Sequence, residues 1–117
     1  MMLVTGPNAI ITVAVDSSVA AAIDVGDGGL VAIQMPSAWT AASLTFQASA
    51  DLNGTYYDVY DITGTELAIT TAASRYIALN ASTFAGLRWI KIRSGTTGTP
   101  VVQGANRTIR TLVRRLS

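Results

Sequence analysis

The sequence predicts an all-β protein, a single antiparallel β-sandwich or jelly roll with at most one short helical turn. Three observations predict this fold. Short segments alternate apolar and polar residues from end to end, as strands with one buried face do. These segments recur roughly every ten residues, with turn-forming residues between them. The length of 117 residues suits one domain, so we expect residues 1–117 to form a single sandwich.

The N-terminal third predicts an arm and three strands. We expect residues 1–9 to form an extended N-terminal arm. Residues 10–15 and 30–35 are rich in Ile, Val and Leu, and each precedes a Ser-containing turn, so both predict strands. The Ala-rich residues 19–25 predict a short strand between them.

A central hairpin is the clearest local prediction. Residues 44–50 place Leu, Phe and Ala on one face and Thr, Gln and Ser on the other, which is the period of a strand. Residues 56–61 return as the partner strand, and Asn53-Gly54 between them favours a tight turn with positive φ. Of the returning strand, we expect Tyr57 and Val59 on the core face and Tyr56, Asp58 and Tyr60 facing outward.

The segment after the hairpin predicts two short strands and a helical turn. Residues 67–71 and 76–79 predict two short strands, and the small residues Ala72, Ala73 and Ser74 lie between them. Residues 80–87 predict one helical turn with Ser82 as its N-cap and Gly86 near its end.

The C-terminal part returns to strand patterning. Residues 88–93 alternate again, so Ile90 and Ile92 are expected inside, with Lys91 and Arg93 outside. Three further segments complete the prediction: a loop over residues 94–100, a short strand over 101–103 and a final strand over 107–116.

Composition excludes several kinds of chemistry. The chain has no His and no Cys, which excludes Ser-His-Asp and Cys-His catalysis, the usual zinc sites, disulfides and thiol redox centres. Asp58 and Asp61 are predicted on opposite faces of one short strand, which disfavours a glycosidase pair. We therefore predict no enzyme, catalytic residue, cofactor or metal site. No basic residue precedes the first apolar stretch and carboxylates interrupt the later ones, so neither a secretory signal nor a membrane span is expected.

Charge is divided along the chain. All seven carboxylates lie at or before Glu66, and all eight cations lie at or after Arg75. One explanation is that early and late strands are neighbours and their charges pair within the molecule. The alternative is that an acidic face of one copy meets a basic face of the next. Nucleic-acid binding is disfavoured because no aromatic-rich strand accompanies the arginines.

Aromatic and cationic side chains expected outside the sandwich are candidates for a protein interface, where such residues are enriched. The aromatic ones also suit a sugar-stacking platform or half-buried packing. The candidate interface residues are Tyr56, Tyr60, Arg88, Trp89, Lys91, Arg93, Arg110, Arg114 and Arg115.

Five stretches carry a family resemblance: LTFQASAD at 44–51, GTYYDVYD at 54–61, RYIAL at 75–79, GLRWIKIRSG at 86–95 and PVVQ at 100–103. Together they resemble the small β-sandwich structural proteins of tailed bacteriophages, and head decoration (cement) proteins in particular. The resemblance implies a non-enzymatic protein on the capsid exterior of the virion, made in the host bacterial cytoplasm. It implies the major capsid protein as partner and self-association, with a trimer favoured, and no nucleic-acid or membrane partner. A tail, neck or baseplate structural protein and a carbohydrate-binding module are the alternatives.

Overall fold

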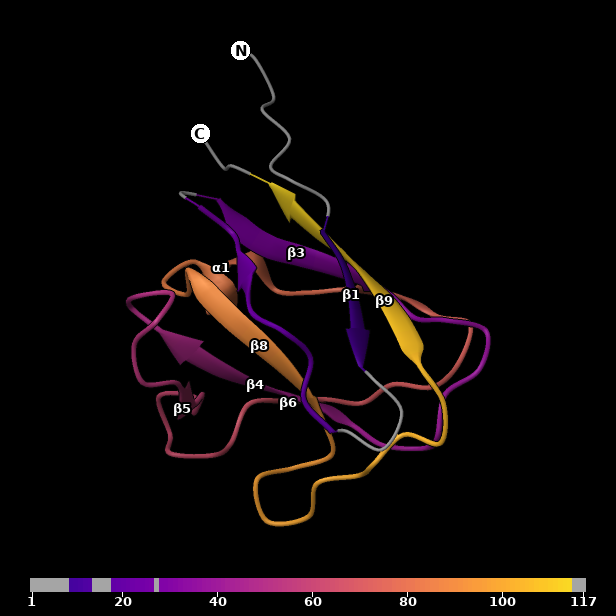
Figure 1. The fold of residues 1–117 in the computed structure, drawn as a ribbon. Coiled ribbons are helices and arrows are strands. Elements are labelled where there is room, and N and C mark those ends of the chain that lie inside the picture. The colour runs from indigo at the N-terminus through magenta and orange to yellow at the C-terminus, as the bar shows by residue number, and fades with distance from the viewer. Residues whose placement is uncertain (1–8, 14–17, 27, 115–117) are drawn as a thin grey trace.

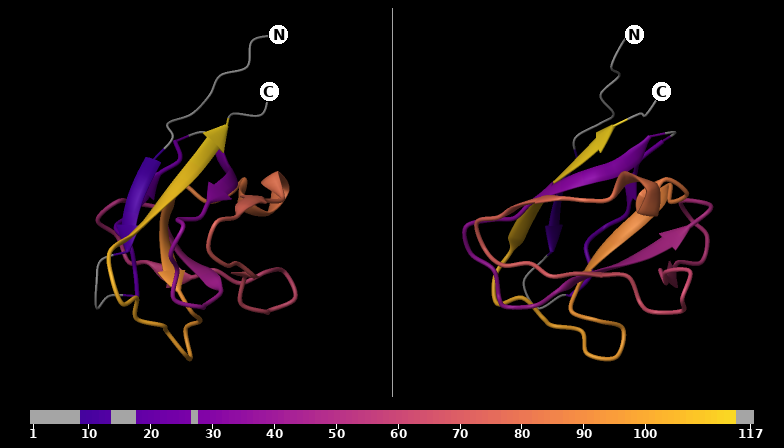
Figure 2. Two further views of the ribbon diagram at one scale, coloured as in Figure 1. Left: turned by 90° about the vertical axis from the view of Figure 1, so that its right-hand side faces the viewer. Right: turned by 180° about the vertical axis from the view of Figure 1, so that it is seen from behind.

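The protein is described by a computed structural model over residues 9–13, 18–26 and 28–114. Two antiparallel sheets pack face to face, which confirms the predicted all-β fold (Figures 1 and 2). Sheet A has the order β1 (Ala9–Val13), β9 (Arg107–Arg114), β3 (Gly29–Gln34) and β7 (Tyr76–Ala78). Sheet B has the order β2 (Ile23–Asp24), β8 (Trp89–Ser94), β4 (Leu44–Ser49) and β5 (Tyr57–Asp58), and β6 (Ala68–Ile69) also pairs with β4. In the described part of the chain, no helix is long and apolar enough to cross a membrane.

The core lies between the two sheets and follows the period of two along each strand. Ile90 and Ile92 of β8 point into it, as the alternation predicts. Each sheet contributes fully buried aliphatic side chains, which removes apolar surface from water at about 25 cal/mol per Å². The principal core residues are Leu30, Ile33, Leu44, Phe46, Phe84, Ile90, Ile92, Ile109 and Val113.

One short helix, α1 (Ala81–Phe84), closes an end of this core. Its N-cap is Asn80, whose side-chain oxygen accepts a hydrogen bond from the backbone N–H of Ser82 at 3.1 Å. The prediction of Ser82 as N-cap is therefore wrong, because the helix begins earlier and the Asn side chain reaches the free N–H first. The turn places the Phe84 ring against Phe46, edge to face at 5.1 Å between centroids.

The central hairpin is confirmed by the antiparallel pairing of β4 with β5. Its turn differs from the prediction, because the positive-φ glycines of the described residues do not include Gly54. The connection from β4 to β5 is longer than two residues, so it needs no primed turn. Instead the Ser49 hydroxyl bonds both the N–H and the carbonyl of Asp51, and the Gly54 N–H donates to the Asp51 carbonyl at 3.1 Å.

Tyr57 was expected in the core and is 71% exposed, so that prediction is wrong. It lies on an edge strand, where it lines an open hollow of about 470 Å³ together with Ala48 and Leu87. Val59, the other residue expected inside, is half-buried and packs against the core.

Two of the remaining predicted strands lie in different sheets, and one predicted strand is absent from the structure. Residues 67–71 and 76–79 contain β6 and β7, which belong to different sheets. Residues 101–103 form no strand. Gln103 is buried there instead, and its amide nitrogen donates to the Thr40 carbonyl and to the Ser94 hydroxyl. Most of the expected arm lies outside the described residues, and Ala9 belongs to β1.

Candidate functional site

The outer face of sheet B displays alternate residues of β8 beside alternate residues of β4. Trp89, Lys91 and Arg93 point outward from β8. The register pairs Ser49 with Trp89 and Gln47 with Lys91, and it also pairs Thr45 with Arg93. Cross-strand neighbours on one face have Cβ atoms about 4.5–5.5 Å apart, so these side chains form rows. The face therefore presents aromatic and charged groups on a regular, hydrogen-bonded support.

Four of the predicted interface residues gather on this face, and we call them the aromatic–cation patch: Tyr56, Arg88, Trp89 and Lys91. The Lys91 ammonium lies 4.3 Å from the centroid of the Tyr56 ring. The Arg88 guanidinium lies 5.0 Å from the centroid of the Trp89 ring. Both distances fall within the range of cation–π attraction. The Tyr56 hydroxyl also donates to the Leu52 carbonyl at 2.9 Å, which fixes the orientation of its ring.

An ion pair orients the edge of the patch. Arg88 Nε lies 3.1 Å from Asp24 Oδ1, and the Gly26 N–H donates to the same oxygen at 2.7 Å. These two hydrogen bonds, that of Arg88 first, lower the pKa of Asp24 from its usual 3.8. Both partners are exposed, so the pair serves to orient Arg88 more than to stabilise the fold.

Arg93 faces outward from β8, as predicted, but its residue is only 4% exposed, so it is not open to solvent; its role in an interface stays a prediction. Its guanidinium bridges two carboxylates: Nη1 lies 2.8 Å from Asp58 and Nη2 lies 2.6 Å from Glu66. Its Nε donates to the Thr45 hydroxyl at 2.9 Å, so each of the three guanidinium nitrogens has a hydrogen-bond partner. The charge is buried because the chain folds two acidic residues over it.

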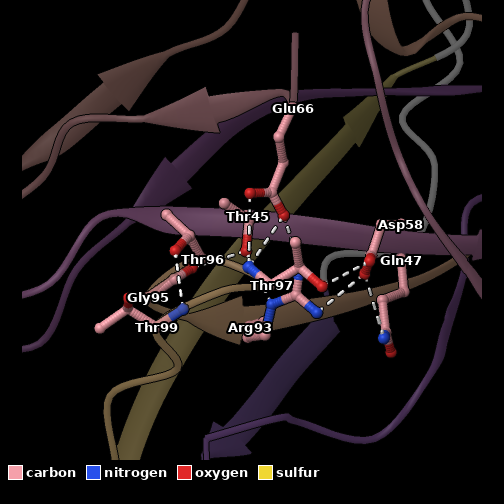
Figure 3. Close-up of polar contacts among 9 residues, drawn as sticks. All are labelled: Thr45, Gln47, Asp58, Glu66, Arg93, Gly95, Thr96, Thr97 and Thr99. Atoms are coloured by element: carbon pink, nitrogen blue, oxygen red, sulfur yellow. Dashed lines mark hydrogen bonds and ion pairs between the residues drawn. The ribbon is translucent and has the colours of Figure 1, made fainter. Parts of the chain in front are cut away.

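The same carboxylates hold the loop that follows β8. A loop was predicted over residues 94–100, and the structure begins it one residue later, since Ser94 belongs to β8. The Thr97 hydroxyl donates to Asp58 Oδ2 at 2.7 Å, and the Thr97 N–H donates to Glu66 Oε2 at 3.1 Å (Figure 3). The pKa of Asp58 is lowered from 3.8, first by the Thr97 hydroxyl and then by hydrogen bonds from Arg93 and Gln47. We call Thr45, Asp58, Glu66, Arg93 and Thr97 the Arg93 network. It ties the loop rigidly to sheet B.

The ion pairs of the structure connect the acidic and basic parts of the chain. Each of the three ion pairs of the described residues joins a carboxylate from the first part of the chain to an arginine from the second. Pairing within the molecule therefore accounts for Arg88 and Arg93. It does not account for Arg75, Arg110 and Arg114, which are exposed and form no ion pair with a described carboxylate.

The other predicted interface residues lie elsewhere. Arg110 and Arg114 are exposed on β9, on sheet A and away from the aromatic–cation patch. Tyr60 is 52% exposed in the β5–β6 connection. Arg115 lies outside the described residues. The predicted set is thus divided between two faces, and the role of these residues in an interface stays a prediction.

Asp58 and Asp61, the pair weighed for glycoside hydrolysis, both have structural partners. The Asp61 carboxylate accepts hydrogen bonds from the N–H groups of Thr63 and Thr65 and from the Thr63 hydroxyl. The Thr63 hydroxyl is the largest cause of a lowered pKa at Asp61, and the pKa of Asp58 is lowered as well. A glycosidase acid needs a raised pKa, so neither carboxyl suits that role. No group of three or more metal-ligating side chains occurs in the part of the chain that the structure describes.

The sequence reasoning missed Glu66 and Thr97, which complete the Arg93 network. The charge division was a signal for Glu66, since it predicted acidic partners for late arginines. Nothing in the sequence signalled Thr97, one of several threonines in that loop.

No protein-family model matches the sequence, and the searches of curated proteins and of solved structures return no match either.

Proposed function

We propose that the chain is a non-enzymatic structural protein of a bacteriophage virion, and specifically a decoration protein that binds and stabilises the assembled shell of major capsid protein. The phage assignment comes from the sequence resemblance given above. The observation that supports a binding role is the aromatic–cation patch, with two aromatic rings and two cations on the outer face of a sheet. Tyr, Trp and Arg are the residues that carry most binding energy at protein interfaces.

The support beneath the patch suits binding. β8 lies between β2 and β4, so both edges of the strand that carries Trp89 and Lys91 are hydrogen-bonded. The Arg93 network fixes the end of that strand and the following loop. A rigid surface loses little conformational entropy on binding, and affinity then depends on buried area and on repeated contacts over the shell.

The test is co-sedimentation of the purified chain with assembled capsid shells of the phage that encodes it. We expect saturable binding of the wild type and at least about tenfold weaker binding of Trp89→Ala, as for a central interface residue. Val102→Ala, an exposed apolar residue outside the patch, is the control and should bind as the wild type does. Failure of the wild type to bind shells, or equal binding by Trp89→Ala, contradicts the proposal.

The aromatic rings of the patch, both half-buried, also favour a second candidate, a carbohydrate-binding module, because sugars stack on Tyr and Trp rings at a protein surface. A glycan array distinguishes the two. Glycan binding that Trp89→Ala abolishes, without shell binding, assigns the patch to sugars. A tail, neck or baseplate position is a third possibility on the same fold, and binding to purified tails but not to shells identifies it.

A further inference from the structure

Among the residues that the structure describes, the charges of the sequence are divided between the two sheets. The carboxylates of the described residues all belong to sheet B or to the turns beside it: Asp24, Asp51, Asp58, Asp61 and Glu66. The cations of sheet B are engaged there, by Asp24, by the Arg93 network and by the Tyr56 ring. The described cations of sheet A and its connections are Arg75, Arg107, Arg110 and Arg114, and none of them forms an ion pair with a described carboxylate. Among the described residues, sheet A therefore carries positive charge that no described carboxylate pairs with.

The outer face of sheet A carries a row of exposed side chains with a hollow on each side of it. The register places Arg110 beside Gln34 and Gln34 beside Tyr76, so these three exposed side chains form one row across three strands. On one side of Gln34, Arg110 lines a shallow hollow of about 330 Å³. On the other side, Arg75 and Tyr76 line a hollow of about 380 Å³. We call this surface, with Arg114, the cationic face.

The opposite kind of surface lies along the β5 edge of sheet B. Two turns there each present a carboxylate followed by an exposed aliphatic side chain: Asp51 with Leu52, and Asp61 with Ile62. Leu52 is 49% exposed and Ile62 is 102% exposed. The hydrogen bonds that Asp61 accepts from Thr63 and Thr65 hold the second turn, so Ile62 projects from a defined support. We call these four residues the acidic edge.

The acidic edge and the cationic face are complementary in charge and in shape. Neither acidic-edge carboxylate forms an ion pair with a described cation, and the arginines of the cationic face have no such partner either. The aliphatic side chains of the edge project, and the cationic face has hollows beside its arginines. In Figures 1 and 2, β9 and the turns around β5 lie on different sides of the molecule, so one copy cannot bring them together.

From this complementarity we infer that the chain self-associates head to tail, the acidic edge of one copy docking on the cationic face of the next. A contact between unlike surfaces repeats around a ring when the rotation closes. The resemblance implies self-association in general, and the inference assigns the two surfaces that make the contact. It uses neither the shell nor the aromatic–cation patch, so its failure is distinguishable from failure of the proposed function.

The test uses two variants that each remove one side of the contact. Arg110→Glu/Arg114→Glu reverses the cationic face. Asp51→Lys/Ile62→Lys reverses the acidic edge and keeps Asp61, which the turn needs. The substituted residues are exposed, and a thermal melt of each variant verifies its fold. Val102→Glu, which adds a negative charge at an exposed residue outside both surfaces and outside the aromatic–cation patch, is the control.

Light scattering coupled to size exclusion gives the result. We expect oligomers of the wild type and of Val102→Glu. These should dissociate as NaCl is raised from about 50 to about 500 mM, because screening shortens the reach of exposed charges. We expect each double variant to be monomeric at the same concentration, with self-association weakened at least about tenfold. An equimolar mixture of the two double variants should form heterodimers, since the intact acidic edge of one variant meets the intact cationic face of the other.

Three outcomes overturn the inference: a monomeric wild type at millimolar concentration, oligomers that survive either double variant, or a mixture that yields no heterodimer. Short duplex DNA is added as a further arm. Binding of that duplex by a monomeric wild type, abolished by the Arg110→Glu/Arg114→Glu variant, assigns the cationic face to nucleic acid and also overturns the inference.

Discussion

Replacing Arg93 by Met tests whether the buried ionic network stabilises this fold. The substitution keeps most of the side-chain length and removes the charge that faces Asp58 and Glu66. Breaking a buried ion pair by removing one partner costs about 3–5 kcal/mol, because the other charge is left uncompensated. The side chains of Asp58 and Glu66 retain 23% and 15% exposure, so solvent relieves part of the cost and we expect the lower end, about 3 kcal/mol.

Thermal unfolding by circular dichroism measures this effect. For a domain of this size about 1 kcal/mol corresponds to roughly 4 °C, so Arg93→Met should melt roughly 12 °C below the wild type at pH 7. Adding Asp58→Asn and Glu66→Gln to Arg93→Met should recover part of the loss, since no carboxylate is then left without its cation.

The matched control is Arg88→Met, which breaks an exposed pair with the same chemistry. It should leave the melting temperature essentially unchanged. Equal melting of Arg93→Met and the wild type, or no recovery on neutralising the two carboxylates, would refute the reasoning.

Three further predictions concern the core, the loop and the acid limit of stability. Phe84→Ala should lower the free energy of unfolding by about 3–5 kcal/mol in urea titration, because it empties the end of the core beside Phe46; a loss below about 1 kcal/mol would show that α1 is not part of the core. Gly95→Ala should cost about 1–3 kcal/mol, because Gly95 has φ +88° and a Cβ there would lie 2.5 Å from the Thr99 carbonyl oxygen. Gly98→Ala, whose Cβ meets open space, is its control, and equal stability of the two variants would contradict the strain argument. The folded-state pKa of Asp58 is lowered from 3.8, so its contribution to stability is present above that pH and is lost as the pH falls below it. Melting temperatures measured from pH 7 to pH 2 should therefore fall mainly below about pH 4. A melting temperature that does not change with pH would contradict the stabilising role of the Asp58 carboxylate.

Period-two patterning predicted the fold class and most strands because burial of one face is a local property of a strand. It succeeded for Ile90 and Ile92, which have the opposite sheet in front of them. It failed for Tyr57, because alternation gives the side of the sheet but not whether the facing sheet extends that far.

The candidate site was less predictable than the fold. Arg93 occupies an outward position of β8, as the alternation requires, but two acidic residues distant in the chain cover it. Only the topology brings Asp58 and Glu66 to that point, so no local pattern reveals the burial. The aromatic–cation patch was predictable in part, since its strand residues lie at alternate positions, whereas the place of Arg110 and Arg114 on the other sheet depends on the strand order.

The measurement that tests the account most directly is electron cryo-microscopy of purified particles of the phage that we propose encodes this chain. The account holds that this two-sheet protein acts through its outer surfaces on other proteins. It predicts many symmetry-related copies on the outside of the head, with the face that carries Trp89 toward the shell. Particles whose heads lack this chain, or carry it only in a few copies at the tail, would contradict it.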